Sequence, residues 1–220
     1  MELTRQAKFI TDFYGSSPAV GYQGVLERYI EDKIDKELLT FAQQEKKKGA
    51  TVEDKVAAIL SIFHRDEEGR PILGSWMLRK CLMNTAYAIF NAQKDKTHPK
   101  KDQIPMAIQL VEPVHINIFK SSNNQTEPNR MIRDSIPQLD ALRVPDGVAT
   151  YTVSISKPKP RSFFKAYEYI KAGAQFRFTV LFDEDLLSLE KMEYLLSKAG
   201  QIGVGAFRER FGKFVIVERV

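Results

Sequence analysis

Hydrophobic and polar residues alternate along several short stretches of the chain, which is the pattern of strands that bury one face. Together with the flanking turn residues, it predicts strands at residues 7–14, 106–110, 114–119, 151–155, 175–182 and 214–217. Residues 62–65 and 70–73 flank an Asp-Glu-Glu-Gly turn and predict a hairpin, whose second strand begins with Pro71 and is therefore expected at a sheet edge. Pro113 separates 106–110 from 114–119, which leaves a hairpin and one bent strand as alternatives.

Apolar residues at steps of three and four predict helices, and capping residues mark their ends. The helices are expected at residues 23–48, 51–58, 75–90 and 188–200. Ser75 and Ser188 are the expected N-caps, and Gly200 is expected to end the last helix. Residues 121–149 contain serine, asparagine, proline and glycine instead, and they predict a long loop.

Without the insertions, these elements run in the order strand, helix, adjacent antiparallel strands, helix, strand. This is the split βαβ order of ferredoxin-like domains, so we expect an α+β fold. We expect a single domain over residues 1–220, with a helical insertion near residues 20–60 and a basic arm near residues 121–172.

The composition is typical of a globular protein, with 43% hydrophobic and 10% aromatic residues. One cysteine excludes a disulfide framework and a thiolate zinc site. No apolar run approaches the roughly 18 residues of a membrane span, and the first residues lack the features of a signal peptide. We therefore expect a cytoplasmic protein with no membrane partner.

Basic residues exceed acidic residues by 5 over the whole chain, and part of the excess is local. Residues 157–171 contain one acidic residue, Glu168, and five basic residues: Lys157, Lys159, Arg161, Lys165 and Lys171. Such a stretch suits phosphate groups, and a solvated loop is the alternative.

Aromatic residues adjoin these charges, as in Phe163, Phe164, Tyr167 and Tyr169. Proteins that bind single-stranded nucleic acid use this mixture, because aromatic rings stack on bases while cations neutralise the backbone. The alternative is that Phe163, Phe164 and Tyr167, which have helical spacing, anchor the segment to the core.

The most distinctive motif is the glycine-rich segment 200–214, between the last expected helix and the last strand. Glycines such as Gly203 and Gly205 allow close backbone approach and expose N–H groups, while Arg208, Arg210 and Lys213 supply charge for phosphates. Dinucleotide and Walker loops follow a strand and open a helix, so this motif is neither. A capping glycine followed by an ordinary turn is the alternative.

This loop resembles the signature of the repeat-associated mysterious protein (RAMP) superfamily, the RNA-binding subunits of CRISPR effector complexes. The turn and basic helix start of residues 71–80 are also similar to those of the backbone subunits. Residues 63–71, 203–208 and 212–214 together resemble uncharacterised phage and prophage proteins of that type. The resemblance implies a ferredoxin-like fold, RNA binding, and the host cytoplasm if the protein is phage-encoded. The loop departs from the CRISPR pattern because residues 211–214 keep one glycine, Gly212.

The chain offers no arrangement typical of a catalytic centre. His64, His98 and His115 lie in a turn, a lysine-rich loop and a strand, without a neighbouring partner in the sequence. Cys81 is expected to be a small buried residue rather than a nucleophile. The acidic groups are not paired with metal-ligating histidines. We therefore expect neither catalytic residues, nor a metal, nor a cofactor.

The sequence predicts a non-catalytic protein that binds single-stranded nucleic acid or RNA, in a phage or mobile-element setting. A structural, self-assembling or host-protein-binding protein is the alternative, and a metal-independent endoribonuclease is a third. The expected nucleic-acid-binding residues are Arg79, Lys80, Lys157, Lys159, Arg161, Lys165, Gly203, Gly205, Arg208, Arg210 and Lys213.

Overall fold

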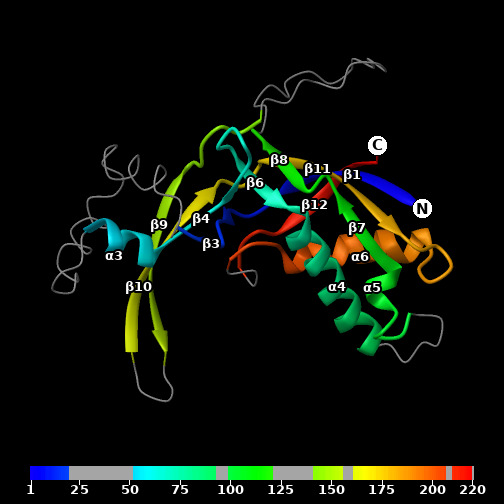
Figure 1. Ribbon diagram of the computed structural model, residues 1–220. Coiled ribbons are helices and arrows are strands. Elements are labelled where there is room, and N and C mark those ends of the chain that lie inside the picture. Colours follow the sequence, from blue (N-terminus) through cyan, green and yellow to red (C-terminus); the bar gives the residue numbers. More distant parts are fainter. Residues whose placement is uncertain (20–51, 93–98, 121–140, 156–160, 207–209, 220) are drawn as a thin grey trace. The chain divides into compact units, whose positions relative to one another are not determined.

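The computed structural model describes the chain except for residues 20–51, 93–98, 121–140, 156–160, 207–209 and 220 (Figure 1). The described part is α+β, with two mainly antiparallel sheets and a few helices. The chain divides into two compact units. Unit 1 comprises Met1–Phe13, Arg65–Val144 and Lys171–Val220, and unit 2 comprises Tyr14–His64 and Pro145–Ile170.

The sheet of unit 1 has the strand order β12-β1-β11-β8-β6-β5, and β7 also pairs with β11. β1 is antiparallel to both β11 and β12, and β11 is antiparallel to β7. The strands are β1 (Glu2–Phe9), β5 (His64–Arg65), β6 (Pro71–Gly74), β7 (Ile108–Glu112), β8 (His115–Phe119), β11 (Gln175–Phe182) and β12 (Phe214–Arg219). The helices are α4 (Ser75–Ala92), α5 (Ile104–Ala107) and α6 (Leu189–Ile202).

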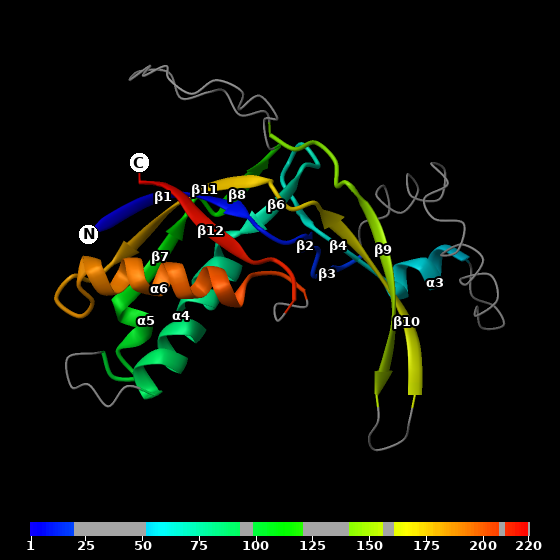
Figure 2. The ribbon, with the colours of Figure 1, turned by 180° about the vertical axis from the view of Figure 1, so that it is seen from behind.

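Strict alternation of apolar residues gives this sheet one buried face. Every second residue of β1 and β11 is buried, and the rings of Phe9 and Phe214 pack against Phe176 with centroids 4.8 and 5.4 Å away. α4 and α6 cover the buried face (Figure 2). The opposite side of the sheet, which carries the intervening residues, is called the open face below.

The two strand-like runs around Pro113 form one interrupted strand along β11. β7 pairs with residues 179–182 of β11, and β8 pairs with residues 175 and 176 of the same strand. The bent-strand alternative is therefore confirmed, with a cis Glu112–Pro113 peptide at the break. Residues 106 and 107 belong to α5 rather than to a strand, because the N–H groups of Met106 and Ala107 donate to the Gln103 carbonyl.

The predicted helices of unit 1 are confirmed as α4 and α6, with a different end for α6. Ser188 is its N-cap, and Gly203 rather than Gly200 is its C-cap. Gly200 lies inside the helix, where a Cβ atom would come within 2.2 Å of the Phe214 carbonyl oxygen. Its absence of a side chain lets α6 approach β12.

The predicted hairpin is present as β5 and β6, but β6 is not at the edge of the sheet. It lies between β8 and β5. Pro71 is tolerated there because it is the first residue of β6.

The first strand starts earlier than predicted, at Glu2 instead of residue 7. Arg5 interrupts the apolar alternation, yet it occupies a buried position facing α6. Its guanidinium group pairs with Glu193 of α6 and donates to the Thr4 carbonyl. Residues 13 and 14 form a separate short strand, β2 (Phe13–Tyr14), at the boundary between the two units.

Unit 2 contains α3 (Val52–Ile59), β3 (Ser17–Pro18), β4 (Leu60–Ile62), β9 (Gly147–Ile155) and β10 (Arg161–Ile170). The sheet has the order β2-β10-β4-β3, with β9 also paired to β10. α3 confirms the short predicted helix, while the predicted helix at 23–48 lies outside the described residues.

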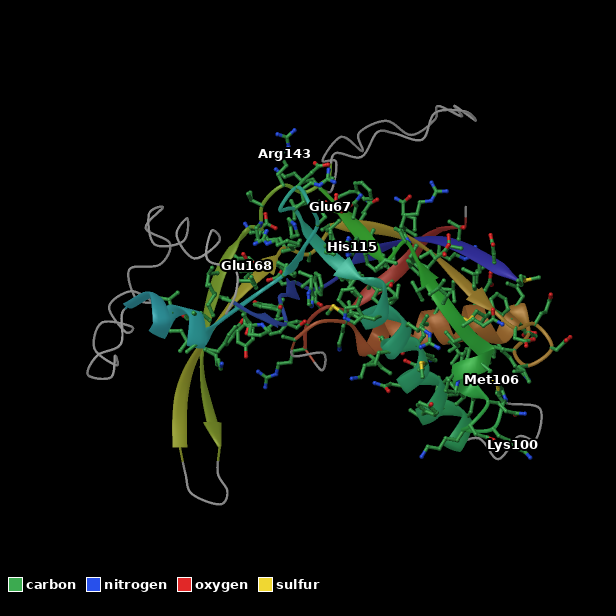
Figure 3. All side chains as sticks on the ribbon, viewed as in Figure 1. Glu67, Lys100, Met106, His115, Arg143 and Glu168 are labelled. Atoms are coloured by element: carbon green, nitrogen blue, oxygen red, sulfur yellow. The ribbon has the colours of Figure 1, made fainter. Side chains whose placement is uncertain are left out.

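The predicted strand at 151–155 is confirmed as part of β9, while the solvated-loop alternative for the basic stretch 157–171 is wrong where β10 forms. β9 and β10 form an antiparallel hairpin from the pair Arg161–Ile155 to the pair Tyr169–Gly147. The pattern concealed β10 because a carboxylate, Glu168, occupies a fully buried position. Its Oε2 accepts a hydrogen bond of 2.7 Å from the Phe63 N–H, and its carbonyl accepts one from Gly15 (Figure 3).

Unit 2 overlaps in part with the two stretches that the sequence sets apart as insertions, near 20–60 and 121–172, although the part of the second stretch up to Val144 belongs to unit 1. Residues 14–64 and 145–170 overlap these stretches and share one sheet.

Candidate nucleic-acid interface

The glycine-rich loop folds back on itself after α6. The Val204 N–H donates to the Gly212 carbonyl at 3.0 Å, and the Gly203 N–H donates to the Ala199 carbonyl at 2.8 Å. Gly203, Gly205 and Gly212 have φ values of 89°, 83° and 67°. The glycines thus give the loop its shape, and the N–H groups of 203, 204 and 212 are bonded within the protein rather than exposed as expected.

Backbone contacts fix the end of this loop against the end of β1. The Gly212 N–H donates to the Asp12 carbonyl at 2.7 Å, the Lys213 N–H donates to Thr11 Oγ1 at 2.9 Å, and the Ile10 N–H donates to the Lys213 carbonyl. Lys213 is therefore held beside the residues that directly follow β1.

The predicted cations of the loop have different surroundings. Arg210 is exposed and Lys213 is partly exposed. Neither side chain makes an ion pair with another described residue. Arg208 lies outside the described residues.

The open face carries a polar ladder on its two central strands. Thr4 and Thr179 are opposite one another, and their hydroxyl oxygens are 2.9 Å apart. Gln6 donates to the side chain of Gln175 at 2.6 Å along a diagonal. The buried neighbours of these residues point to the helices, so the ladder lies on the other side of the sheet.

Two cations that sequence reasoning missed complete this face. Lys8 is opposite Gln175, and Arg177 is opposite Gln6. Neither forms an ion pair within the described part of the chain. Lys8 is also opposite Val215 of β12, two residues beyond Lys213. We call Lys8, Arg177, Arg210 and Lys213 the basic face.

Arg79 and Lys80, the predicted basic residues of α4, have separate roles. Arg79 donates from its guanidinium group to the carbonyls of Pro105 and Ile108, each at 3.0 Å. It holds α5 and the start of β7 against α4. Lys80 is exposed. The adjacent Cys81 is buried, as expected, and its Sγ donates to the carbonyls of Ala199 and Gly203, which ties α4 to the start of the glycine-rich loop.

The remaining predicted cations belong to unit 2. Lys165 is on β10, and its Nζ donates to the Ala58 carbonyl in α3 at 3.2 Å. Arg161 is the first residue of β10, although its side chain is outside the described part, as are Lys157 and Lys159. These positions are in unit 2, while the basic face is in unit 1.

Beside Lys165, unit 2 has a cluster of four tyrosines. Tyr14 is in contact with Tyr151, Tyr167 and Tyr169, with ring centroids 5.9, 6.4 and 5.9 Å away. The hydroxyl groups of Tyr14 and Tyr151 are hydrogen-bonded at 2.8 Å. Burial raises the pKa of the Tyr167 hydroxyl above its ordinary value. Tyr167 belongs to the strand β10, so the helical segment suggested by the spacing of Phe163, Phe164 and Tyr167 is wrong.

The titratable residues do not assemble into a metal site in the described part of the chain, where no three His, Cys, Asp or Glu side chains converge. His115 is exposed at the start of β8 (Figure 3), His64 is in β5, and His98 lies outside the described residues. The described helices also include none with the length and apolar character needed to cross a membrane.

A groove of about 560 Å³ lies between α6 and β12. Its polar lining includes Glu190, Glu193 and Arg5, and Arg5 is already paired with Glu193. The groove is therefore poorly suited to phosphate groups.

No protein-family model matches the chain, and a search of curated proteins found no relative. The assignment of function therefore rests on the chemistry of the basic face.

Proposed function

We propose that this protein binds single-stranded nucleic acid or RNA through the basic face of unit 1, without catalysing a reaction on it. The observation that carries the proposal is the placement of Lys8, Arg177 and Lys213 around the end of β1, with Arg210 exposed in the adjoining loop and no ion pair from any of the four to an acidic residue in the described part of the chain. Cations without partners attract phosphates more strongly than cations that already have salt bridges.

The proposed fold of unit 1 is ferredoxin-like and RAMP-like. Its support is the strand order β12-β1-β11-β7, in which β1 and β7 run in the same direction on either side of β11. α4 lies between β1 and β7 in the chain, after the first segment of unit 2 and the β5–β6 hairpin, and α6 connects β11 to β12. This is the split βαβ order. The setting in a phage or mobile element rests on the sequence resemblance alone.

The ladder of the open face favours contact with the nucleic-acid backbone. Its threonine and glutamine side chains are hydrogen-bonded to each other and give the surface a polar character. Gln6 is paired with Arg177 and Lys8 with Gln175, so the two cations are diagonal rather than direct cross-strand neighbours. This separates the two like charges, and each can bind its own phosphate. A flexible single strand adapts to such a spacing more easily than a stiff duplex.

The experiment compares charge-removal variants in fluorescence anisotropy with a labelled, unstructured oligonucleotide. Lys8→Ala/Arg177→Ala should weaken binding by about tenfold or more, because hydrogen bonds between charged groups contribute about 1.5–3 kcal/mol each in favourable sites. The control, Lys100→Ala/Lys101→Ala, removes the same charge from an exposed turn before α5.

Equal weakening by the two double variants would show attraction by net charge and contradict a defined face. No binding by the wild type at low salt would contradict the function itself. The oligonucleotide recovered after each titration should be intact, with or without Mg²⁺, and cleavage that His115→Ala abolishes would favour the ribonuclease alternative.

A further inference from the structure

Trp76, the only tryptophan of the chain, is half exposed at the start of α4. Its side chain is 46% exposed. The ring lies against Gly74, where a Cβ atom would come within 2.4 Å of two ring carbons. One part of the ring therefore packs on the glycine backbone, and the rest is exposed. A half-exposed aromatic ring offers an apolar, planar surface on which a planar ligand can stack.

Polar and basic groups surround this ring. Lys80 is exposed one helical turn after Trp76. His115, also exposed, is the strand partner of Gly74, on which the ring is seated. The Ser75 N–H donates to the Val114 carbonyl at 3.0 Å, which fixes the start of α4 against the start of β8. Aromatic residues next to cations and hydrogen-bonding groups are typical of surfaces that bind single strands.

β8 connects this position to the basic face. Its residues Ile116 and Ile118 are buried, so His115, Asn117 and Phe119 lie on the open face. Phe119 is opposite Gln175, which is opposite Lys8. The three β8 residues on the open face therefore run from Phe119, next to the basic face, to the exposed His115, next to Trp76, over about four residues or roughly 13 Å. A single strand of a few nucleotides spans this length.

We propose that Trp76 stacks on a base of the single-stranded nucleic acid whose backbone is held by the basic face. The inference rests on the proposed function and adds a base contact that the ladder of the open face does not provide. The ligand class is an unpaired nucleotide within a single strand, because a base inside a duplex cannot present its face to the ring.

The intrinsic fluorescence of the protein tests this directly, since all tryptophan emission comes from Trp76. Addition of oligothymidylate to the full-length protein should quench the emission, with the same midpoint as the anisotropy of the labelled oligonucleotide. It should also protect the tryptophan from quenching by acrylamide. Binding seen by anisotropy with unchanged fluorescence contradicts the stacking but leaves the proposed function intact, whereas absence of binding contradicts both.

Variants separate stacking from a general aromatic effect. Trp76→Leu should weaken affinity by about tenfold, the loss typical of one base stack. Tyr194→Leu is the matched control, because Tyr194 is 44% exposed on α6 and also has a lysine, Lys198, one turn later. Equal affinities of the two variants contradict the proposal. Should Trp76→Leu fail to fold, as judged by circular dichroism, the acrylamide protection of the wild type decides the question.

Discussion

At the scale of single residues, Gly212 determines the shape of the loop that carries Lys213. Its φ of 67° is in the left-handed region, and a Cβ atom there would come within 1.9 Å of the Val204 carbonyl oxygen. Gly69 has a similar φ of 76°, but nothing lies within 4 Å of its Cβ position. A comparison of substitutions at Gly212 and Gly69 therefore distinguishes two effects of adding a side chain: strain from the left-handed backbone, which both positions have, and a steric clash, which only Gly212 has.

We predict that Gly212→Ala lowers the stability by more than about 2 kcal/mol, while Gly69→Ala lowers it by about 1 kcal/mol. Both variants bear the strain of a left-handed residue, and only Gly212→Ala also forces the loop backbone apart. Urea denaturation followed by circular dichroism measures the difference. Equal midpoints for the two variants would contradict the close packing of the loop.

Asp66 is the residue that organises the turn between β5 and β6. Its Oδ1 accepts from the N–H groups of Glu68 and Arg70, and its Oδ2 accepts from Arg70 Nε at 2.7 Å. Burial alone would raise the pKa of Asp66, but the hydrogen bonds from Arg70 and Glu68 outweigh it and lower the pKa below the ordinary 3.8. Folding therefore favours the ionised carboxylate.

We predict that Asp66→Asn is destabilised by about 1 kcal/mol near pH 7 and that this difference disappears in acid. A group whose folded pKa is lowered stabilises the protein above its ordinary pKa, and this contribution is lost as the pH falls through the folded value. Urea midpoints of the wild type and Asp66→Asn, measured between pH 7 and pH 2, give the difference. A difference that persists unchanged at pH 2 would mean that the charge of Asp66 contributes nothing.

At the scale of elements, helices and strands with a regular apolar pattern could be predicted. Strands in which a charged residue occupies a buried position could not. β11, β12, α4 and α6 follow regular apolar patterns, and all four were predicted with only small shifts at their ends. The start of β1 and most of β10 were missed because Arg5 and Glu168 occupy buried positions. Their partners, Glu193 and the Phe63 N–H, are 188 and 105 residues away in the sequence. No local pattern reveals that such a buried charge has an ion-pair or hydrogen-bond partner so far away in the sequence.

The candidate site could be predicted only in part for a similar reason. Arg210 and Lys213 of the proposed site could be named from the sequence because they lie in a recognisable glycine-rich segment. Lys8 and Arg177 were missed because each is an isolated cation in its own strand, and only the register of β1 with β11 brings them to one face. Arg79 was expected to bind nucleic acid. Its guanidinium group instead donates hydrogen bonds to the carbonyls of Pro105 and Ile108, at the junction of α5 and β7.

At the scale of the molecule, unit 1 carries the basic face and unit 2 contains the tyrosine cluster. The basic residues of the β9–β10 hairpin add to the positive charge of the chain, but the defined face consists of residues of unit 1. Binding of a single strand by unit 1 is therefore the central claim, and the number of phosphates that it neutralises is the quantity to measure.

The dependence of affinity on salt measures this number most directly. For single strands, the slope of log K against log salt concentration changes by about 0.7 for each phosphate neutralised. We predict a clear negative slope for the wild type, flattened by about 1.4 in Lys8→Ala/Arg177→Ala if each cation meets one phosphate. Lys100→Ala/Lys101→Ala should retain the wild-type slope. A slope that is the same in the wild type and in Lys8→Ala/Arg177→Ala would contradict nucleic-acid binding through the basic face.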